Sequence, residues 1–456
     1  MKVLIIQLAK MGDIIQSFQL CKAILSSSQK PEIYFLHSEI FSDTLNLLNN
    51  IKPIPVNLDL LAEQKDDQYL LKKNEYAKQI IKQLNGFDYV INLNGSALSA
   101  SIMSLIDCPN KRGFASSYKN DEKWLNFIIS FMKNRYLASF NLVDIFGKLN
   151  PFSHIVSAKK TQNNNAKKQV AIQLGSRNSK RHPLMSDFAK IANKLIANNY
   201  QIVLTGVQSE MPLYHDFITL IDKKEHINNM IGKTKLKDLY QILDQSQYLI
   251  SSDTGTMHLA AQTSCKVFAI FLGSAYPYET LSFKTDTIVY FPNHDIIKCY
   301  PCSELSKCPF DFVCKEFDSN IISDYIIYEK QSNKLHKAIC DSLGQFIVPL
   351  IKQKPADHQL FALIWRIAAA QYFFNTKISL SDYRHYFDFD QQQLSDAKRL
   401  IEREIKIAKL TINKPIQINE LNDNYYFLNP LLIYNLLWQS FDEFIDIINE
   451  IIKPIT

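Results

Sequence analysis

Residues 251–261 read SSDTGTMHLAA and lie between two short apolar runs, 248–250 (YLI) and 267–273 (VFAIFLG). A strand, a short polar turn, a helix and a second strand form the βαβ unit of a parallel sheet. The turn carries Ser, Asp, Thr and Gly where the helix begins, and such residues cap helices and let a ligand approach the backbone. The stretch therefore predicts a site for a phosphate-bearing anion, with an ordinary helix cap as the open alternative.

Composition narrows the class of protein. The chain has 456 residues, of which 46% are hydrophobic, and this indicates two or three globular domains. It has 11 glycines and no G-x-G-x-x-G motif, which disfavours a nicotinamide-dependent dehydrogenase. The formal net charge of +6 suits anionic small molecules or a membrane surface better than it suits nucleic acid.

The sequence also bears on location. No apolar run approaches the roughly 18–20 residues of a membrane span. The apolar opening soon meets Lys10 and Asp13, so it is a poor signal peptide. We expect a cytoplasmic protein, with peripheral contact to the cytoplasmic face of the inner membrane as an option.

Apolar strands and amphipathic helices alternate along the first 340 residues. In the first part we expect strands at 3–8, 33–36 and 89–93 and helices at 14–25, 41–48 and 69–84. In the second part we expect strands at 170–174, 202–204, 248–250 and 267–273 and helices at 185–196, 211–220 and 236–243. This alternation predicts α/β domains with doubly wound parallel sheets.

The domain boundaries follow from where the pattern breaks. Residues 159–168 (KKTQNNNAKK) are polar and lack periodicity, which predicts a linker between domains at 1–158 and 169–340. After about residue 340 only helices are expected, at 356–375, 391–409 and 430–452. Residues 341–456 are therefore predicted to be a helical extension of unknown role.

Two further motifs join the opening stretch. Residues 3–17 read VLIIQLAKMGDIIQS and residues 174–183 read LGSRNSKRHP. Together with DTGTMHLAA at 253–261, they resemble glycosyltransferase family 9, the heptosyltransferases of lipopolysaccharide core synthesis. The resemblance covers roughly residues 1–335, although His182 stands where the family's middle motif usually has Trp. It implies the GT-B type of fold, with two Rossmann-like domains facing across a cleft.

The resemblance also implies a reaction. Family members move a sugar, usually heptose from ADP-heptose, to an acceptor hydroxyl with inversion at the anomeric carbon, and transfer requires no cofactor. Asp13 matches the family's general base, and a carboxylate beyond the end of a strand can take the proton of an attacking hydroxyl. The alternative role for Asp13 is to cap the helix that follows it.

The remaining donor residues are carried over in the same way. Lys180 matches a Lys that contacts phosphate and stabilises the charge of the leaving diphosphate, and Arg181 would assist it. The other predicted donor contacts are Thr254 and Gly255 at the diphosphate, Asp253 orienting the turn, His258, and Met230 and Gly232 near the nucleotide base. For His258, a buried structural histidine is an equal alternative.

The N-terminal domain of the family binds the acceptor. We therefore expect an anionic glycolipid acceptor to contact this domain at Lys10, Gly12, Asn94, Ser96 and Arg112. The run of residues 111–135 holds several Lys and Arg among aromatic residues, which suits an anionic acceptor. A solvated basic helix face is the alternative for that run.

Four cysteines form a separate cluster, with the spacing C-x2-C-x5-C-x5-C at Cys299, Cys302, Cys308 and Cys314. This spacing predicts a structural site for zinc or another thiophilic metal, distant from the transfer chemistry. Reduced thiols without a metal are the alternative.

Two other functions remain open at this point. The first alternative is that the chain is a related enzyme of the same family that glycosylates a protein or another polysaccharide. The second alternative, from another class, is a catalytically silent module that binds nucleotide sugars. The presence of Asp13 and Lys180 argues against it.

Overall fold

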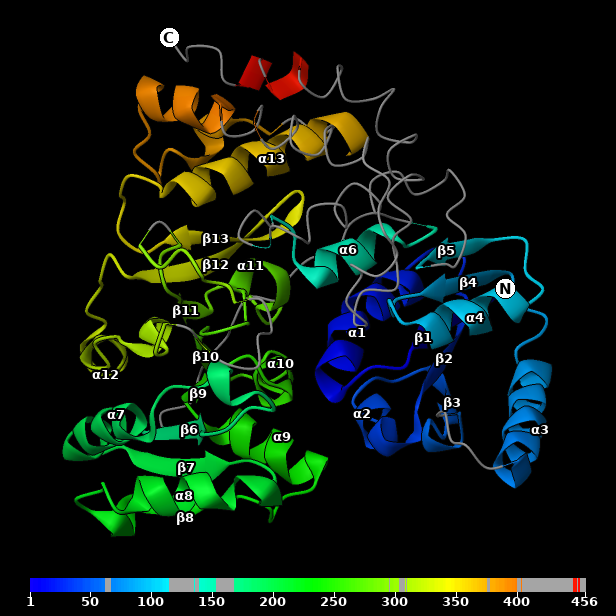
Figure 1. The fold of residues 1–456 in the computed structure, drawn as a ribbon, viewed down its shortest axis with the longest axis horizontal. Coiled ribbons are helices and arrows are strands. Elements are labelled where there is room, and N and C mark those ends of the chain that lie inside the picture. The colour runs from blue at the N-terminus through cyan, green and yellow to red at the C-terminus, as the bar shows by residue number, and fades with distance from the viewer. Residues whose placement is uncertain are drawn as a thin grey trace. The chain divides into compact units, whose positions relative to one another are not determined.

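The computed structural model has two compact α/β units (Figure 1). It describes residues 1–61, 67–114, 135, 139–152, 168–294, 296–302, 308, 310–374, 378–399, 403, 446–448, 450 and 451. Within these residues, unit 1 comprises 1–114 and 143–152, and unit 2 comprises 135, 139–142 and residues from 168 onward. The expected linker at 159–168 lies outside the described residues except for Lys168.

Unit 1 is built on a parallel sheet of five strands in the order β3-β2-β1-β4-β5. The strands are β1 (Lys2–Gln7), β2 (Glu32–Ser38), β3 (Ile51–Val56), β4 (Tyr89–Asn92) and β5 (Lys111–Gly113). The helices are α1 (Met11–Leu25), α2 (Ser42–Leu45), α3 (Asp67–Gln83), α4 (Ala97–Leu105) and α6 (Leu142–Lys148), which begins at the unit boundary. The central strand β1 is buried from Val3 onward, as expected for a sheet covered on both faces.

Unit 2 is built on a sheet of eight strands in the order β13-β12-β11-β10-β9-β6-β7-β8. The strands are β6 (Gln169–Gln173), β7 (Gln201–Thr205), β8 (Ile227–Asn229), β9 (Tyr248–Ser251), β10 (Lys266–Ile270), β11 (Ile288–Tyr290), β12 (Leu335–Asp341) and β13 (Gly344–Pro349). Strands β6 to β11 run parallel, whereas β12 and β13 join antiparallel at one edge.

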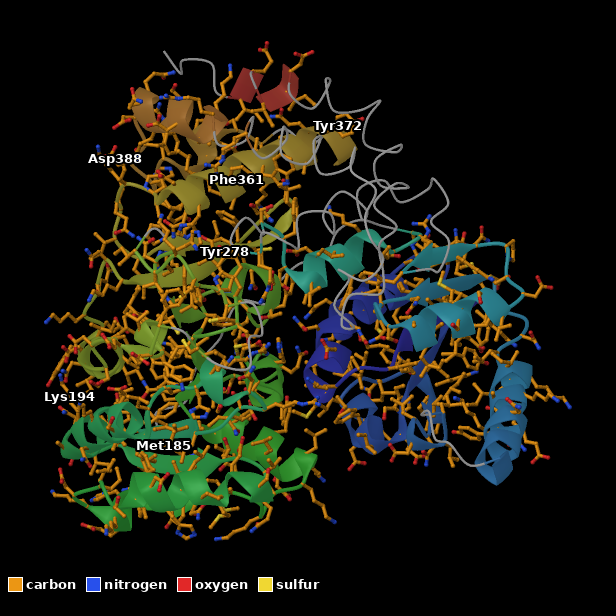
Figure 2. All side chains as sticks on the ribbon, viewed as in Figure 1. Met185, Lys194, Tyr278, Phe361, Tyr372 and Asp388 are labelled. Carbon is orange, nitrogen blue, oxygen red and sulfur yellow. The ribbon has the colours of Figure 1, made fainter. Side chains whose placement is uncertain are left out.

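Helices surround this second sheet. They are α7 (Met185–Ala197), α8 (Met211–Ile218), α9 (Leu236–Gln245), α10 (Gly255–Ala260), α11 (Pro277–Thr280), α12 (Asn320–Tyr328) and α13 (Asp357–Phe374). Lys194 of α7, labelled in Figure 2, forms an ion pair with Asp324 of α12 at 2.5 Å. Among the described residues, no helix combines the length and apolar character needed to cross a membrane.

Several elements differ from the sequence prediction, and short strands such as β8 and β11 were not expected. The helix expected at 41–48 is only the four-residue α2. Strand β3 was not predicted, because Pro53 and Pro55 lack the N–H that a central strand needs, and the strand lies at the sheet edge where such prolines are tolerated. The hairpin of β12 and β13 extends the second sheet to Pro349, beyond residue 340, where only helices were expected.

The predicted helix at 356–375 is present as α13, and residues 391–399 are also helical. Most of the helix predicted at 430–452 lies outside the described residues. In unit 2, Arg135 and residues 139–142 group with the second sheet, although they precede the expected linker.

Candidate active site

In unit 2, the order of the strands reverses between β6 and β9, since the chain proceeds from β6 to β7 and β8 on one side and from β9 to β10 on the other. Ligands of open parallel sheets bind beyond the carboxyl ends of the strands at such a switch point. The segments that follow β6 and β9 carry the predicted Lys180 and the predicted Asp253–Thr254–Gly255 turn. The topology therefore brings these two motifs to the same edge of the sheet.

The turn after β9 is held by Thr254. Its hydroxyl lies 2.8 Å from that of Ser251 and accepts a weak hydrogen bond of 3.4 Å from the Met257 N–H, which makes Thr254 the N-cap of α10. Helix α10 has only six residues, so its macrodipole is small. The chemistry of the turn therefore rests on individual side chains and N–H groups.

Asp253 pairs with the middle motif instead of capping the helix. Its Oδ2 accepts a hydrogen bond from Arg181 Nη1 at 3.1 Å, and Arg181 Nε donates to the Ser274 hydroxyl at 2.8 Å. These bonds join the segments after β6, β9 and β10, which are distant in sequence. Asp253 and Arg181 thus orient each other.

His258 lies in the second turn of α10 and is buried. Its Nε2 is 3.9 Å from Asp253 Oδ1, and burial lowers the pKa of its imidazole to about 4. A histidine in this setting is neutral near pH 7. This favours the structural role that the sequence left open for His258.

Lys180 lies in the 3-10 turn η5 (Ser179–Arg181). Its backbone N–H donates to Asn178 Oδ1 at 3.0 Å, and its half-buried ammonium forms no hydrogen bond or ion pair with a described residue. His182, two residues after Lys180, stands where the family usually has Trp; it is buried and its Nδ1 lies 2.9 Å from the Pro183 carbonyl oxygen. The turn therefore presents an ammonium that a ligand can engage.

Sequence reasoning missed Glu210, which follows β7 in the same sheet. Its Oε2 accepts hydrogen bonds from Gln173 Nε2 at 2.6 Å and from the Val207 N–H at 3.1 Å. Burial raises the pKa of its carboxyl, and these two bonds oppose the shift. Its signal in the sequence was a carboxylate four residues after the glycine that ends an apolar strand, at Gly206.

Glu210 is packed against two glycines. A Cβ at Gly175 would lie 2.3 Å from Glu210 Oε1, and a Cβ at Gly206 would lie 2.1 Å from Oε2. Only glycine leaves room for the carboxylate at both positions. Gln173 extends the network, since its Oε1 accepts from the Thr256 hydroxyl of α10 at 3.0 Å.

The predicted base region follows β8. Gly232 has φ +71° and its N–H donates to the Gly206 carbonyl at 2.9 Å. A Cβ at Gly232 would lie 2.1 Å from Gln208 Oε1, so the glycine is required by both space and conformation. Met230 is half-buried beside it, and its N–H donates to Leu204 O of β7 at 3.0 Å.

The cysteine cluster corrects one prediction. Among residues that the structure describes, no three His, Cys, Asp or Glu side chains gather as ligands for a metal ion, so the predicted metal site finds no support. Cys302 and Cys314 instead share a hydrogen bond, which lowers the pKa of Cys314. For the other two cysteines, burial raises the pKa of the half-buried Cys299, and Cys308 Sγ accepts the Phe312 N–H at 3.3 Å.

The cluster was also expected to lie far from the transfer chemistry, but among the described residues its segment lies near the turn of Lys180, a predicted donor residue. The Cys302 N–H donates to the Gly273 carbonyl at 2.9 Å. A Cβ on Gly273 would lie only 2.5 Å from the carbonyl oxygen of Lys180. The segment therefore packs behind the Lys180 turn.

Unit 1 has its own switch point, between β1 and β4. Asp13 lies in the first turn of α1, directly after β1, and is half-buried. Its Oδ2 accepts the Lys10 N–H at 3.2 Å, so it does supply a helix-capping bond. Burial raises the pKa of the Asp13 carboxyl, while the Lys10 N–H and the Lys10 charge oppose the shift.

Two of the predicted acceptor residues are tied to this turn. Gln7 Oε1, at the end of β1, accepts from the Ala9 N–H at 3.2 Å and from Asn94 Nδ2 at 3.1 Å. Ser96 caps α4 by accepting the Ser99 N–H at 3.2 Å. The segment of Asn94 and Ser96 therefore lies beside the turn that holds Lys10, Gly12 and Asp13.

Arg112 is placed further along the sheet, on edge strand β5. Its Nη1 donates to the Asn150 carbonyl at 3.5 Å. Gly113 beside it has φ +91°, and a Cβ there would lie 2.0 Å from Asn92 O. Most of the basic run, residues 115–134, lies outside the described residues, and Arg135 forms a two-pronged ion pair with Glu279 within unit 2.

The model of "Glycosyltransferase family 9 (heptosyltransferase)" matches residues 77–304, which is half of the chain. The chain belongs to glycosyltransferase family 9. The family predicted from the three motifs is thus confirmed, and with it that the protein is a glycosyltransferase.

Individual relatives are distant. A lipopolysaccharide heptosyltransferase 1 of Campylobacter coli is 24% identical over 313 residues, covering 63% of this chain and 87% of the relative. A lipooligosaccharide heptosyltransferase 2 of Haemophilus influenzae is 24% identical over 237 residues, covering 46% of this chain and 68% of the relative.

Among solved structures, a family 9 glycosyl transferase from Veillonella parvula matches with a TM-score of 0.55 and 14% identity, over 72% of this chain and 97% of that one. At this identity the match speaks for the fold alone. The two Rossmann-like units of the family 9 enzyme are of the GT-B type, as the resemblance implied.

Proposed function

We propose that this family 9 enzyme transfers heptose from ADP-heptose, with inversion, to a hydroxyl of lipopolysaccharide core or a related glycan. Unit 2 holds the donor and unit 1 holds the acceptor. The observation that carries the proposal is the Lys180 ammonium, which no described residue engages, in the turn that Arg181 joins to Asp253. A fixed cation there suits a leaving diphosphate, whose negative charge grows as the glycosidic bond breaks.

The acceptor is activated by Asp13. Its ionised carboxylate takes the proton of the acceptor hydroxyl while that oxygen attacks the anomeric carbon of the sugar. The raised pKa supports this role because a more basic carboxylate removes a proton more readily. Attack from the face opposite the leaving group inverts the configuration at that carbon.

The bond that breaks joins the anomeric carbon to the diphosphate oxygen, and its electron pair leaves with ADP. Lys180 neutralises the charge on the diphosphate, and the Thr254 hydroxyl and Gly255 N–H donate hydrogen bonds to the same oxygens. Arg181, held by Asp253 and Ser274, adds a second positive charge. The step therefore uses groups of this chain alone.

The nucleoside is recognised by the network after β7 and β8. In Rossmann-like sheets a carboxylate beyond a strand end accepts hydrogen bonds from ribose hydroxyls, and Glu210 is the described carboxylate beyond β7 in this unit. Met230 and the Gly232 backbone line the place of the adenine ring. The exposure of Gly232 and its place just after β8, beyond the carboxyl end of that strand, support this.

For the acceptor, we propose an anionic glycolipid reached from the cytoplasmic face of the inner membrane. Lys10, Gly12, Asn94 and Ser96 contact it near Asp13, and Arg112 offers a fork for a carboxylate or phosphate. The net charge of +6 supports an anionic partner. Fractionation of cells with and without high salt tests the location, and a protein found only outside the cytoplasm contradicts it.

The function is tested by incubating the full chain with ADP-heptose or UDP-sugars and truncated lipopolysaccharide acceptors, and detecting the product by mass. We expect heptose addition with ADP-heptose and release of ADP. Transfer only from a UDP-sugar contradicts the donor, and transfer only to a protein or another polysaccharide favours the alternative acceptor. Donor binding without any transfer favours the silent nucleotide-sugar-binding module.

The mechanism is tested with Asp13→Asn. We expect kcat to fall by about 10²–10⁴-fold, while the affinity for ADP stays within about twofold, because Asp13 does not contact the donor nucleotide in this proposal. Asp43→Asn is the matched control, since Asp43 is an exposed carboxylate in the first turn of another unit 1 helix. Near-normal turnover by Asp13→Asn removes Asp13 as the base.

A further inference from the structure

The turn that carries Lys180 is too short to set its own direction. It is a three-residue 3-10 turn, capped by Asn178 Oδ1 on the Lys180 N–H at 3.0 Å. Ser176 donates its hydroxyl to the Asn178 carbonyl at 2.6 Å. Since these bonds are local, the orientation of the turn relative to the sheet depends on neighbours from elsewhere in the chain.

One such neighbour is Lys315, which directly follows Cys314, the last cysteine of the cysteine-rich segment at 299–314. Its Nζ donates to the Ser179 carbonyl at 2.7 Å, across 136 positions of sequence. The ammonium also lies 5.3 Å from the ring centroid of Phe312, and the side chain is half-buried. Lys315 therefore holds the backbone at Ser179, one residue before Lys180.

The second neighbour is Gly273, which follows β10. Its φ is +60°, and an added Cβ would lie 2.5 Å from the carbonyl oxygen of Lys180 and 3.0 Å from the Lys180 Cβ. Gly273 is held from behind, because its own carbonyl accepts the Cys302 N–H at 2.9 Å. This part of the chain therefore contacts the η5 turn in two ways. Lys315 bonds to Ser179 directly, and Cys302 bonds to Gly273, which packs against Lys180.

We propose that Lys315 and Gly273 are positioning residues that aim the Lys180 ammonium at the donor diphosphate. This inference rests on the proposed function, because it assigns a partner to the same Lys180. Neither residue contacts the donor, and both act through the η5 turn. In this proposal, contacts from the cysteine-rich segment support donor binding by fixing the orientation of the η5 turn.

The first test is Lys315→Met, with Lys330→Met as control; Lys330 is also a unit 2 lysine, is 72% exposed and lies 3.8 Å from Asp324. A partly exposed bond to an ammonium contributes modestly, so we expect ADP affinity and donor KM to worsen by about two- to fivefold. Acceptor KM and the melting temperature should stay unchanged. Lys315→Arg should restore the donor KM, because a guanidinium can donate to the same carbonyl.

A double variant separates positioning from a general structural role. If Lys315 acts through Lys180, adding Lys315→Met to Lys180→Met should weaken ADP binding no further, so the two losses are not additive. Independent, multiplying losses overturn the inference. The inference is also overturned if Lys315→Arg fails to restore the donor KM while the fold is intact.

Gly273→Ala tests the other side of the turn. Gly86→Ala is its control, because Gly86 has φ +77° and nothing within 4 Å of the added Cβ. Both changes carry the conformational cost of a positive φ, but only Gly273→Ala pushes on Lys180. We expect Gly273→Ala alone to weaken ADP binding, by about tenfold or more, and equal ADP affinity in the two variants contradicts the role of Gly273.

A measurement without turnover completes the set. Amide hydrogen exchange over residues 176–183 should speed up in Lys315→Met and stay unchanged in Lys330→Met, in the absence of any ligand. Wild-type protein that does not bind ADP overturns the proposed function and this inference together. Wild-type binding that Lys315→Met leaves unaltered overturns the inference alone.

Discussion

A buried ion pair between Arg366 and Asp341 joins α13 to the hairpin of β12 and β13. Arg366 is fully buried, and its guanidinium donates to Asp341 at 3.2 and 2.8 Å and to the Ser139 carbonyl at 2.9 Å. Its charged carbon lies 5.1 and 5.2 Å from the ring centroids of Phe140 and Phe346. We predict that Arg366→Met, which keeps an unbranched apolar stem but removes the guanidinium, destabilises unit 2 severely.

The magnitude follows from what the substitution leaves behind. Burial opposes ionisation of Asp341, but the Arg366 charge and hydrogen bonds, the Tyr383 hydroxyl and the Leu343 N–H lower its pKa overall. Removing Arg366 strands a carboxylate with 16% exposure, and breaking one side of a buried pair costs about 3–5 kcal/mol. In a unit of this size that loss lowers the melting temperature on the order of 10 °C.

The assay is urea unfolding followed by tryptophan fluorescence. Trp365 precedes Arg366 and is buried against Phe361, labelled in Figure 2, with the rings 5.7 Å apart. Arg399→Met is the control, because Arg399 and Asp396 form an exposed pair at 2.5 Å, and its loss should change stability by less than about 1 kcal/mol.

A double variant provides the sharpest check of the reasoning. Arg366→Met with Asp341→Leu replaces both charges by apolar groups, so it should be more stable than Arg366→Met alone. A double variant that is less stable than the single one refutes the account of a stranded carboxylate. So does an Arg366→Met protein that unfolds at the wild-type urea concentration.

Three further predictions concern other parts of the molecule. Lys284→Met should lower the free energy of unfolding by about 3 kcal/mol in urea titrations, because the buried Lys284 ammonium donates to the carbonyls of Ala260, Thr263 and Cys265 at 3.4, 2.7 and 2.6 Å; a loss below about 1 kcal/mol contradicts this. Glu210→Gln should weaken ADP binding about tenfold by calorimetry, and unchanged affinity removes Glu210 from the nucleoside site. Burial lowers the pKa of His336 to about 3, so the unfolded chain takes up a proton that the folded chain does not. Stability should therefore fall as pH drops below 6.5, by about 1.4 kcal/mol per pH unit for this group. His336→Gln should flatten that slope in urea midpoints measured between pH 6.5 and 4.5, and an unchanged slope contradicts the assignment.

The elements that could be predicted from sequence are those whose signal is local. Strands β1, β6 and β9 are buried on both faces and read as continuous apolar runs. Helix α13 could be placed within a residue at either end. Its attachment could not, because the residues that bury Arg366 stand 25 and 227 positions away from it in sequence.

The same distinction holds at the site. The turn at Asp253, Thr254 and Gly255 could be predicted because its chemistry lies in consecutive residues. Glu210 could not, since its surroundings come from the ends of two strands and are recognisable only when Gly175 and Gly206 are seen to leave room for it. The position of Cys302 near the Lys180 turn could not be predicted for the same reason, because the contact runs through Gly273.

The candidate sites of the two units share one feature, a buried glutamine at the end of a strand. Gln7 ends β1 and Gln173 ends β6, each the first strand of its sheet, and their exposures are 1% and 4%. Each side-chain oxygen joins neighbouring segments at the switch point: Gln7 Oε1 accepts from Ala9 and Asn94, and Gln173 Oε1 accepts from the hydroxyls of Thr205 and Thr256.

A buried amide oxygen left without donors is costly, so each glutamine requires its strand-end loops to meet. In unit 1 this requirement places the Asn94 loop beside the turn of Asp13, and in unit 2 it places α10 beside Glu210 through Gln173. Each sheet therefore brings its own candidate residues together through contacts of the chain itself. Such preorganisation is what a transferase needs if its fixed charges are to stabilise a transition state without reorganising.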